Sequence, residues 1–345
     1  MTKPDQNISL KSDQIFRMTD DTGMLQHSVY GIPDLAKGYT TDDNARALIM
    51  AIKLFDQHRE KAIEKLMSKY IAFLFYAQNT DGKFKNFMGY NREFLEDEGS
   101  EDCFGRCMWA LCFAYASPIT PKSIKNTAWK MIENALPNCL KLSSPRANAY
   151  LIIGLKYLNQ EKTNEYITKL ADILSNHYDH YNNGDWHWFE DSLTYCNATL
   201  PWAMLSAFSI TKIERHKQVG FESLKFLESK TFSKGYFKPI GCKGWLKKGK
   251  APAEFDEQPV EACETMLAYI EAYSISGNIL FLNKAKTCFS WYTGKNSKGL
   301  SLIDNETGGC CDAITSDGLN LNQGAESIVS FWIAYLDIKK FGKNS

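Results

Sequence analysis

The strongest constraint on the fold is an alternation of two kinds of helix along the chain. Six stretches are apolar on every side of a helix, and each opens with polar or small residues; they are 42–55, 101–116, 144–158, 195–210, 258–275 and 323–338. Amphipathic stretches with Lys- and Glu-rich faces lie between them, at 59–78, 121–140, 161–178, 217–232 and 278–294. A helix that is apolar all round is buried, and an amphipathic helix covers it.

This alternation predicts an all-α fold, a closed ring of helical hairpins known as the (α/α)6 toroid. An open solenoid would need terminal repeats with polar outer faces, which the sequence does not contain. We expect residues 15–345 to form this single domain after a polar tail at residues 1–14. The sixth outer helix is expected either from residues 11–30 or from beyond residue 338. The loops combine glycine with aromatic residues and predict turns rather than a substantial sheet.

In such a ring the inner helices run parallel, so their first turns meet at one rim. The residues that this rule brings to the rim are Tyr39, Asp42, Asp43, Glu101, Asp102, Arg146, Trp188, Glu190, Asp191, Tyr195, Asp256, Glu257, Glu261, Asn322 and Glu326. Helix capping explains each acidic residue by itself, but it does not explain the aromatic residues beside them. Carboxylates and amides bind hydroxyls, and flat aromatic rings stack on sugar C–H surfaces. The rim therefore predicts a carbohydrate substrate.

Paired carboxylates also supply the chemistry of glycoside hydrolysis. We expect Asp102 to be the general acid, because the charge of Glu101 should raise its pKa and the apolar run after it can desolvate it. Glu257 is the expected base, because loop 244–256 can bring it to water, and inversion is the expected outcome. The second candidate pair is Glu190 with Glu261.

The other rim residues are expected to bind sugar. Asp43 and Glu326 are assigned to hydroxyl binding. Trp188 should line the cavity, with Trp186 or Phe189 buried behind it, because alternate residues of an extended loop face opposite ways.

Composition and motifs exclude several other classes. The 40 Lys and Arg residues balance 40 Asp and Glu residues, which argues against a nucleic-acid partner. No apolar run is long enough for a membrane span, and residues 1–14 lack the apolar core of a signal peptide, so we expect a cytoplasmic protein. The ten cysteines are expected to be reduced and buried.

No cofactor and no metal site are predicted. Cys103 and Cys107 have no second pair with zinc spacing, and the acidic residues at 304–312 do not match a calcium-binding EF-hand. The chain has only six histidines, so few residues are available for a mechanism that uses two histidine bases.

Six motifs in order resemble a known bacterial domain over roughly residues 20–340. They are "LQHSVYGIPDLAKGYTTDDNARAL", "SEDCFGRCMWAL", "SPRANAYLIIGL", "WFEDSLTYCNATLPWAML", "FDEQPVEA" and "DGLNLNQGAESIVSF". That domain occurs alone or C-terminal to group 1 (GT-B type) glycosyltransferase domains, and it is similar to the six-hairpin glycosidase superfamily. The resemblance implies the toroid and a sugar-related function. A glycosyltransferase activity is not expected here, because this chain has no nucleotide-sugar Rossmann half.

The leading hypothesis is a glycoside hydrolase that acts on a bacterial oligo- or polysaccharide. Three alternatives stay open. One is a glycan-binding accessory module that works with a separate glycosyltransferase partner. The others are a sugar epimerase and a phosphorylase, the latter because Arg46, Arg106 and Arg146 lie just inside inner helix starts and suit phosphate.

Overall fold

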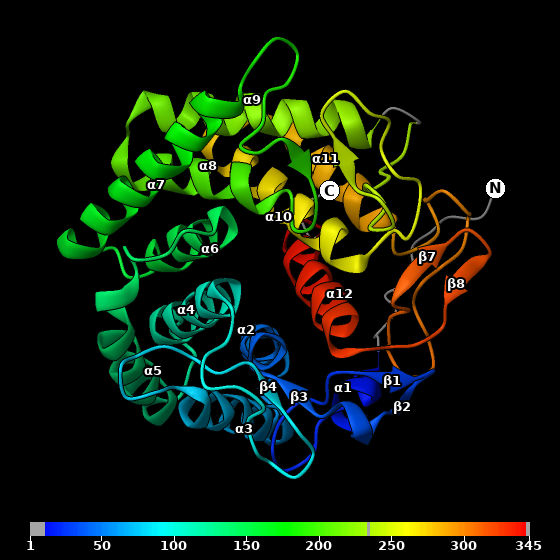
Figure 1. Cartoon of the computed structure of the whole chain (residues 1–345). Coiled ribbons are helices and arrows are strands. Elements are labelled where there is room, and N and C mark those ends of the chain that lie inside the picture. Colours follow the sequence, from blue (N-terminus) through cyan, green and yellow to red (C-terminus); the bar gives the residue numbers. More distant parts are fainter. Residues whose placement is uncertain (1–10, 233–234, 343–345) are drawn as a thin grey trace.

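Six helices form a closed inner ring in the computed structural model, which describes residues 11–232 and 235–342. They are α2 (Thr41–His58), α4 (Glu101–Ala116), α6 (Pro145–Leu155), α8 (Thr199–Thr211), α10 (Pro259–Ser276) and α12 (Ala325–Ile338). Each inner helix packs against the next, and α12 returns to pack against α2 (Figure 1). The predicted (α/α)6 toroid is confirmed.

An outer layer of amphipathic helices surrounds this ring. It contains α3 (Lys61–Ala77), α5 (Lys122–Ala135), α7 (Glu161–Tyr181), α9 (Glu214–Thr231) and α11 (Ile279–Ser290), each packed against the inner helix before it. Short 3₁₀ helices occur at η1 (Leu35–Lys37), η2 (Leu136–Asn138) and η3 (Lys339–Phe341).

The sixth outer position is filled by a short helix near the N-terminus, α1 (Asp13–Arg17). The Gln14 amide donates to the Thr307 carbonyl at 2.9 Å, and the Thr19 hydroxyl lies 2.8 Å from the Tyr70 hydroxyl of α3. The sixth outer helix thus comes from the 11–30 segment, the first of its two expected origins. Residues 1–10 of the predicted polar tail lie outside the described residues. Gln14 is buried, so the packed structure begins just before the predicted boundary at residue 15.

Four two-stranded antiparallel ribbons form in the loops of the described residues. They are β1 (Ser28–Val29) with β2 (Ile32–Pro33), β3 (Tyr39–Thr40) with β4 (Phe87–Met88), β5 (Ser192–Leu193) with β6 (Leu246–Lys247), and β7 (Ala313–Thr315) with β8 (Gly318–Asn320). Several of these strands lead into inner helices; β3, for example, ends where α2 begins. The ribbons therefore fix loops at the N-terminal rim of the ring.

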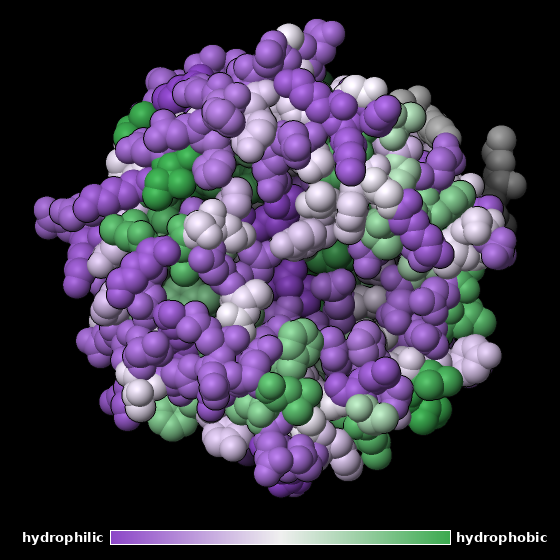
Figure 2. All heavy atoms as spheres, viewed as in Figure 1, coloured by the Kyte–Doolittle hydropathy of each residue, from purple (hydrophilic) through white to green (hydrophobic). Residues whose placement is uncertain are grey.

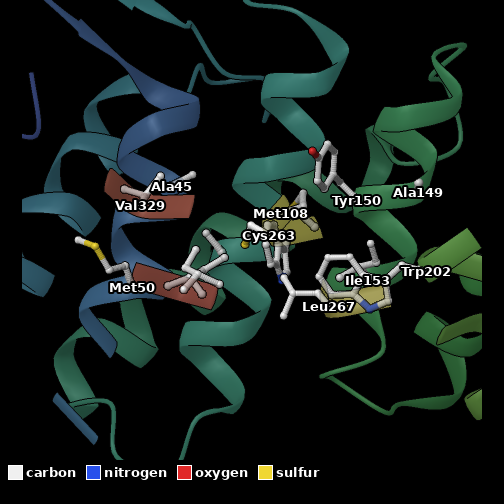
Figure 3. Close-up of a cluster of buried hydrophobic side chains, with 14 of the residues drawn as sticks. Ala45, Met50, Met108, Ala149, Tyr150, Ile153, Trp202, Cys263, Leu267 and Val329 are labelled. Atoms are coloured by element: carbon white, nitrogen blue, oxygen red, sulfur yellow. The ribbon is translucent and has the colours of Figure 1, made fainter. Parts of the chain in front are cut away.

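Apolar side chains fill the centre of the ring. All six inner helices contribute, through residues such as Ala45, Met50, Met108, Ala149, Tyr150, Ile153, Trp202, Cys263, Leu267 and Val329 (Figure 3). All ten cysteines are free thiols, and all but Cys242 are buried. In the described part of the chain, no helix has the length and apolar character needed to cross a bilayer. Because the centre is a packed core, a ligand site has to lie at a rim.

Two glycines allow α4 and α6 to approach closely. A Cβ on Gly154 would lie 2.7 Å from the Trp109 Cα, and one on Gly105 would lie 2.9 Å from the Ala147 carbonyl oxygen. Only glycine fits such contacts. The starts of both helices are capped by serine: Ser100 accepts from the Cys103 amide and Ser144 from the Ala147 amide. These contacts fix the position of the residues in the first turns.

Candidate active site

A pocket of about 360 Å³ opens at the N-terminal rim of the ring. Its wall contains five carboxylates, from α2, α12 and the loops before α10 and α12: Asp42, Asp43, Asp256, Asp312 and Glu326. Arg46, His27, Asn86 and Phe87 also line it. Figure 2 shows a hydrophilic hollow near the centre of this face of the molecule. The structure therefore brings Asp42, Asp43, Asp256 and Glu326 together, as predicted from their places at or just before the starts of inner helices.

Asp42 and Asp43 lie in the first turn of α2, but their side chains bind other side chains. Asp43 accepts a hydrogen bond from the Thr40 hydroxyl at 2.5 Å, and it forms an ion pair with Arg46 at 2.7 Å. Asp42 lies 2.5 Å from Nη1 of Arg106 on α4. Thr40, the residue before the helix, makes no side-chain capping bond. Simple capping therefore does not account for this acidic pair.

The two neighbouring carboxyls have opposite pKa shifts. Burial and the negative charge of Asp42 raise the pKa of Asp43 to about 7. Burial acts in the same direction on Asp42, but Arg106 and Arg46 outweigh it and hold its pKa below the usual range. A pair of carboxyls whose pKa values are pushed apart provides one proton donor and one fixed negative charge near neutral pH.

Arg46 bridges Asp43 to Glu326 on the adjacent helix α12. Its Nη2 lies 2.7 Å from Asp43 and its Nη1 lies 3.0 Å from Glu326. The two terminal nitrogens of a guanidinium are about 2.3 Å apart, so the bridged carboxylate oxygens of Asp43 and Glu326 are at most about 8 Å from each other. Asp43 is almost buried, whereas the Glu326 side chain is 39% exposed and accessible to water.

Asp312 and His27 occupy another part of the pocket wall. Asp312 accepts hydrogen bonds from the Gly324 amide and the Ser327 hydroxyl, both at 2.7 Å, and burial raises its pKa. His27 is exposed and acts electrostatically on Asp312. The sequence places Asp312 in a loop that leads to the rim but gives it no role, and His27 was not among the predicted site residues although it lies close to a rim motif. Within the described residues, no group of three or more His, Cys, Asp or Glu side chains is arranged to hold a metal ion.

Asp102 lies in a second polar cluster, between α4, α6 and the loop before α8. Its two oxygens accept hydrogen bonds from the Ser144 and Tyr195 hydroxyls, both at 2.7 Å. The Glu101 carboxylate accepts from the Ser143 and Ser144 amides at 2.8 and 2.6 Å. Asp102 does not line the 360 Å³ pocket.

Arg146 holds the loop of this second cluster in place. It donates to the Tyr195 carbonyl, the Thr194 hydroxyl and the Glu190 carboxylate at 2.6, 2.8 and 2.8 Å. Arg106 connects the two clusters, because it binds Asp42 and also donates to the Cys196 sulfur at 3.2 Å. All three arginines proposed for phosphate binding are thus paired with carboxylates of the rim.

Glu261 lies below the rim and does not line the pocket. It accepts hydrogen bonds from the Cys196 amide and the Asn197 side chain. Burial and the charge of Glu264 raise the pKa of Glu261 to about 7. Glu264 in turn accepts from the Tyr150 and Thr199 hydroxyls at 2.6 and 2.5 Å. The structure does not bring Glu261 into contact with its predicted partner Glu190, which pairs with Arg146.

Two aromatic predictions are wrong. Trp188 is completely buried and packs against Phe189 and Phe226, so it does not line the cavity. Trp186 and Phe189 are buried, as expected for one of them, and their rings contact Phe226 of α9 and Tyr178 of α7. Tyr39 is 1% exposed and donates to Asp20 at 2.5 Å, so it lies under the surface.

The expected orientation of Glu257 is also wrong. It is fully buried, and its carboxylate accepts from Trp291 Nε1 at 2.8 Å and from the Ser297 hydroxyl. Its backbone pairs with Ile314 in extended conformation, and adjacent residues of an extended segment face opposite ways. Asp256 therefore faces the pocket, while Glu257 faces the outer layer.

Two further predicted binding residues lie outside the pocket. Asp191 is exposed and accepts from the Ser192 hydroxyl. Asn322 accepts from the Tyr30 amide at 2.9 Å and so fixes the β1–β2 ribbon to the loop before α12.

Comparisons with known proteins support the fold. No protein-family model matches the chain, and no curated protein matches it in sequence. Solved structures do match. A sugar epimerase from a ruminal bacterium superposes with a TM-score of 0.73 at 14% identity, over 97% of both chains. Cellobiose 2-epimerase from Bacillus thermoamylovorans gives 0.72 at 11% identity, over 95% of this chain and 96% of that one.

A third match is the GH76A α-1,6-mannanase from Salegentibacter, with a TM-score of 0.62 at 11% identity over 95% and 97% of the two chains. At these identities the similarity establishes the toroid fold shared with sugar-processing enzymes. Membership of the glycosyltransferase-associated domain family remains a prediction.

Proposed function

We propose that this protein is a carbohydrate-active enzyme, and specifically a glycoside hydrolase whose active site is the pocket at the N-terminal rim. The observation that carries the proposal is the Arg46 bridge between Asp43 and Glu326. Carboxyl pairs of glycosidases are roughly 6.5–9.5 Å apart in inverting enzymes and about 5–5.5 Å apart in retaining ones. The limit of about 8 Å set by the bridge is compatible with such a pair.

In this proposal Asp43 is the general acid. Its pKa of about 7 allows it to hold a proton near neutral pH, and the ionised Asp42 beside it maintains that shift. Asp43 gives its proton to the glycosidic oxygen as the bond from that oxygen to the anomeric carbon breaks. Glu326, the more exposed partner, takes a proton from the water that attacks this carbon. Inversion, the outcome expected from the sequence, is kept as the proposed stereochemistry.

This assignment replaces the pair expected from the sequence. Glu257 contacts Trp291 and not the pocket, so it is not retained as the base. Asp102 is kept as a sugar-binding residue, because Tyr195 beside it is 39% exposed at the rim. The phosphorylase alternative loses support, because Arg46, Arg106 and Arg146 are already paired with carboxylates.

The experiment that tests the proposal is a hydrolysis assay with a panel of bacterial oligosaccharides, including α-1,6-linked manno-oligosaccharides and cello-oligosaccharides, with NMR of the product anomer. Asp43→Asn and Glu326→Gln should each lower kcat by at least about 100-fold, the low end of a general acid–base contribution. Asp56→Asn is the matched control, since Asp56 lies at the other end of α2 and is exposed. Near-normal turnover by either pocket variant would contradict its assigned role.

One observation favours a second candidate, a sugar epimerase. His27 lines the pocket and lies close enough to act on Asp312, so one imidazole is available for proton transfer at a sugar carbon. Incubation with mannose, glucose and cellobiose in D₂O distinguishes the two reactions. An epimerase incorporates deuterium at the inverted carbon, and a hydrolase does not. Glycan binding without either reaction would instead indicate the accessory-module alternative.

A further inference from the structure

Two aromatic rings meet beside the pocket, at the β5–β6 ribbon. Tyr195, two residues after β5, is 39% exposed, and Trp245, one residue before β6, is partly exposed. Their ring centroids are 6.4 Å apart and their planes are inclined at 53°. Single exposed aromatic residues are common on protein surfaces and need no explanation. These two differ because their rings are in contact with each other; we call the pair the aromatic corner.

The loop that carries Trp245 begins and ends at the pocket wall. Cys242 and Asp256 both line the pocket, and the Cys242 amide donates to the Asp256 carbonyl at 2.9 Å. Trp245 has a left-handed backbone, with a φ of 60°, which is strained for a bulky residue. Hydrogen bonds hold it there, from the Trp245 amide to the Gly241 carbonyl at 3.1 Å and from the Ala253 amide to the Trp245 carbonyl at 2.8 Å. Strain that the surrounding structure maintains in this way is concentrated at ligand sites.

Tyr195 is joined to another part of the same wall. The next residue, Cys196, also has a positive φ, of 49°, and its amide donates to the buried carboxylate of Glu261. The Cys196 sulfur accepts a hydrogen bond from Arg106 at 3.2 Å. Arg106 in turn binds Asp42, which lines the pocket. Glu261, which has no part in the proposed reaction, therefore fixes the turn that holds Tyr195 next to the pocket.

Charged side chains fix the Tyr195 ring itself. Its hydroxyl donates to Asp102 at 2.7 Å, and the guanidinium of Arg146 lies 4.6 Å from the ring centroid. A guanidinium over an aromatic face is attracted by the electrons of the ring. One face of Tyr195 is therefore covered by Arg146, and Trp245 stands at an angle to the same ring. The aromatic corner is thus held in place before any ligand binds.

We infer that Tyr195 and Trp245 bind a further sugar unit of an oligosaccharide whose reacting unit occupies the pocket. This inference rests on the proposed function, since it assumes a carbohydrate in the pocket. Aromatic rings bind the C–H surfaces of pyranoses, and the adjacent Asp102 carboxylate can accept hydrogen bonds from hydroxyls. A pocket of about 360 Å³ is near the lower end of the roughly 300–1,000 Å³ that ligand sites span. A longer glycan therefore extends past the pocket wall, where the aromatic corner lies.

The aromatic corner takes the role that the sequence assigned to Trp188. Trp245 belongs to the loop 244–256, whose expected function was to bring Glu257 to water, and the sequence gave Trp245 itself no role. The substrate class that follows is an oligo- or polysaccharide of pyranoses, rather than a monosaccharide.

The test measures affinity as a function of glycan length. Calorimetric titrations use manno- and cello-oligosaccharides from mono- to hexasaccharide, with the wild-type protein and with Glu326→Gln, in which the ligand should not be hydrolysed during the measurement. A trisaccharide or longer glycan should bind more tightly than the corresponding monosaccharide. Trp245→Ala should weaken binding of the longer glycan by about 5- to 30-fold, as loss of one anchoring aromatic ring does, and leave monosaccharide affinity unchanged.

Three further variants complete the design. Glycine adopts a left-handed backbone without strain, so Trp245→Gly removes the ring without distorting the loop and should weaken binding as Trp245→Ala does. Trp245→Phe keeps an aromatic ring and should lose less affinity than either. Trp129→Ala is the matched control, because Trp129 is a partly exposed tryptophan at a separate pocket formed by α5 and α7, and it should not change affinity. Thermal melts establish that each variant is folded.

The inference is overturned if affinity does not rise with glycan length, or if Trp245→Ala and Trp245→Gly have the same effect at every length. Its failure is distinct from failure of the proposed hydrolase. Hydrolysis that depends on Asp43 but shows no length effect rejects the aromatic corner alone. A length effect that depends on Trp245, without hydrolysis, rejects the reaction and keeps the aromatic corner.

Discussion

Arg46 and Glu326 are 280 positions apart in the sequence, and their side chains form an ion pair with a distance of 3.0 Å. Arg46 belongs to the first inner helix and Glu326 to the last, so this contact lies where the ring closes. The same guanidinium binds Asp43. Arg46 therefore contributes both to closure of the ring and to assembly of the candidate active site.

Replacing Arg46 by glutamine should destabilise the protein. Above pH 7, where Asp43 is ionised, loss of the almost buried Arg46 leaves that carboxylate buried without this cation. Breaking a buried ion pair costs roughly 3–5 kcal/mol, and we expect about 3 kcal/mol because Glu326 is partly exposed. Urea denaturation measures the change in the free energy of unfolding. Arg59→Gln, which removes an exposed pair at the other end of α2, should change it by less than about 1 kcal/mol. Equal stability of the two variants would disprove the bridging role.

The activity of the proposed hydrolase should decrease as the pH rises through about 7. The pKa of Asp43 is raised to about 7, and the acid form is the one that donates the proton. Asp42→Asn removes the negative charge that raises this pKa, so the alkaline limb of kcat/KM should move to lower pH. The pH profile of kcat/KM reports groups of the free enzyme. Asp56→Asn should leave the limb in place. If the alkaline limb of the kcat/KM profile stays in place or moves to higher pH in Asp42→Asn, Asp43 is not the general acid.

Trp188→Ala should affect stability and not sugar affinity. Trp188 is fully buried, and removal of a buried tryptophan side chain costs roughly 3–5 kcal/mol. Thermal and urea unfolding measure this loss, and titration with a bound glycan at a temperature where the variant is folded measures affinity. His187→Ala, at the exposed neighbouring position, is the control and should be close to neutral. A selective loss of glycan affinity in Trp188→Ala would contradict the buried position.

Asp337 should stabilise the end of the ring opposite the pocket. Both of its oxygens lie 2.8 Å from Nζ of Lys53, and Lys340 is 2.7 Å from one of them. Burial opposes ionisation of Asp337, but the two lysines hold its pKa below the usual value. Its contribution is therefore present above the unfolded pKa of about 3.9 and is lost as the pH falls through the lower, folded value.

Asp337→Asn should cost about 3 kcal/mol at neutral pH, because it leaves Lys53 buried without its partner. The difference in unfolding free energy between wild type and variant should shrink as the solution is acidified below about pH 4. Turnover at 25 °C should be unchanged, because this pair is remote from the pocket. A difference that is constant with pH would mean that Asp337 is not the ionised partner of Lys53.

The ring could be predicted from the sequence because helices that are apolar on all sides give a strong periodic signal. The stretch at 101–116 coincides with α4. The stretch at 195–210 is less accurate: α8 begins at Thr199, because Cys196 has a positive φ of 49° and residues 196–198 form a turn before the helix. Local backbone geometry of this kind is not visible in hydrophobic periodicity.

The candidate site could be predicted only in part. The positions of the helix starts in the sequence were sufficient to predict that Asp42, Asp43 and Glu326 lie at one rim, because the first turns of parallel inner helices lie at the same end of the ring. They were not sufficient for Trp188 and Glu257, which belong to extended segments where a change of one residue reverses the face. Phe87 was missed because it reaches the pocket through pairing of β4 with β3, a contact between loops that no periodic pattern encodes.

During synthesis of the chain, Glu326 is added 280 residues after Arg46. During most of translation, α2 lacks its neighbour α12, and the pocket lacks Glu326. A partly synthesised chain therefore lacks the candidate active site, and it exposes the kind of apolar surface that chaperones recognise. The pocket is completed only when α12, at residues 325–338, packs between α10 and α2.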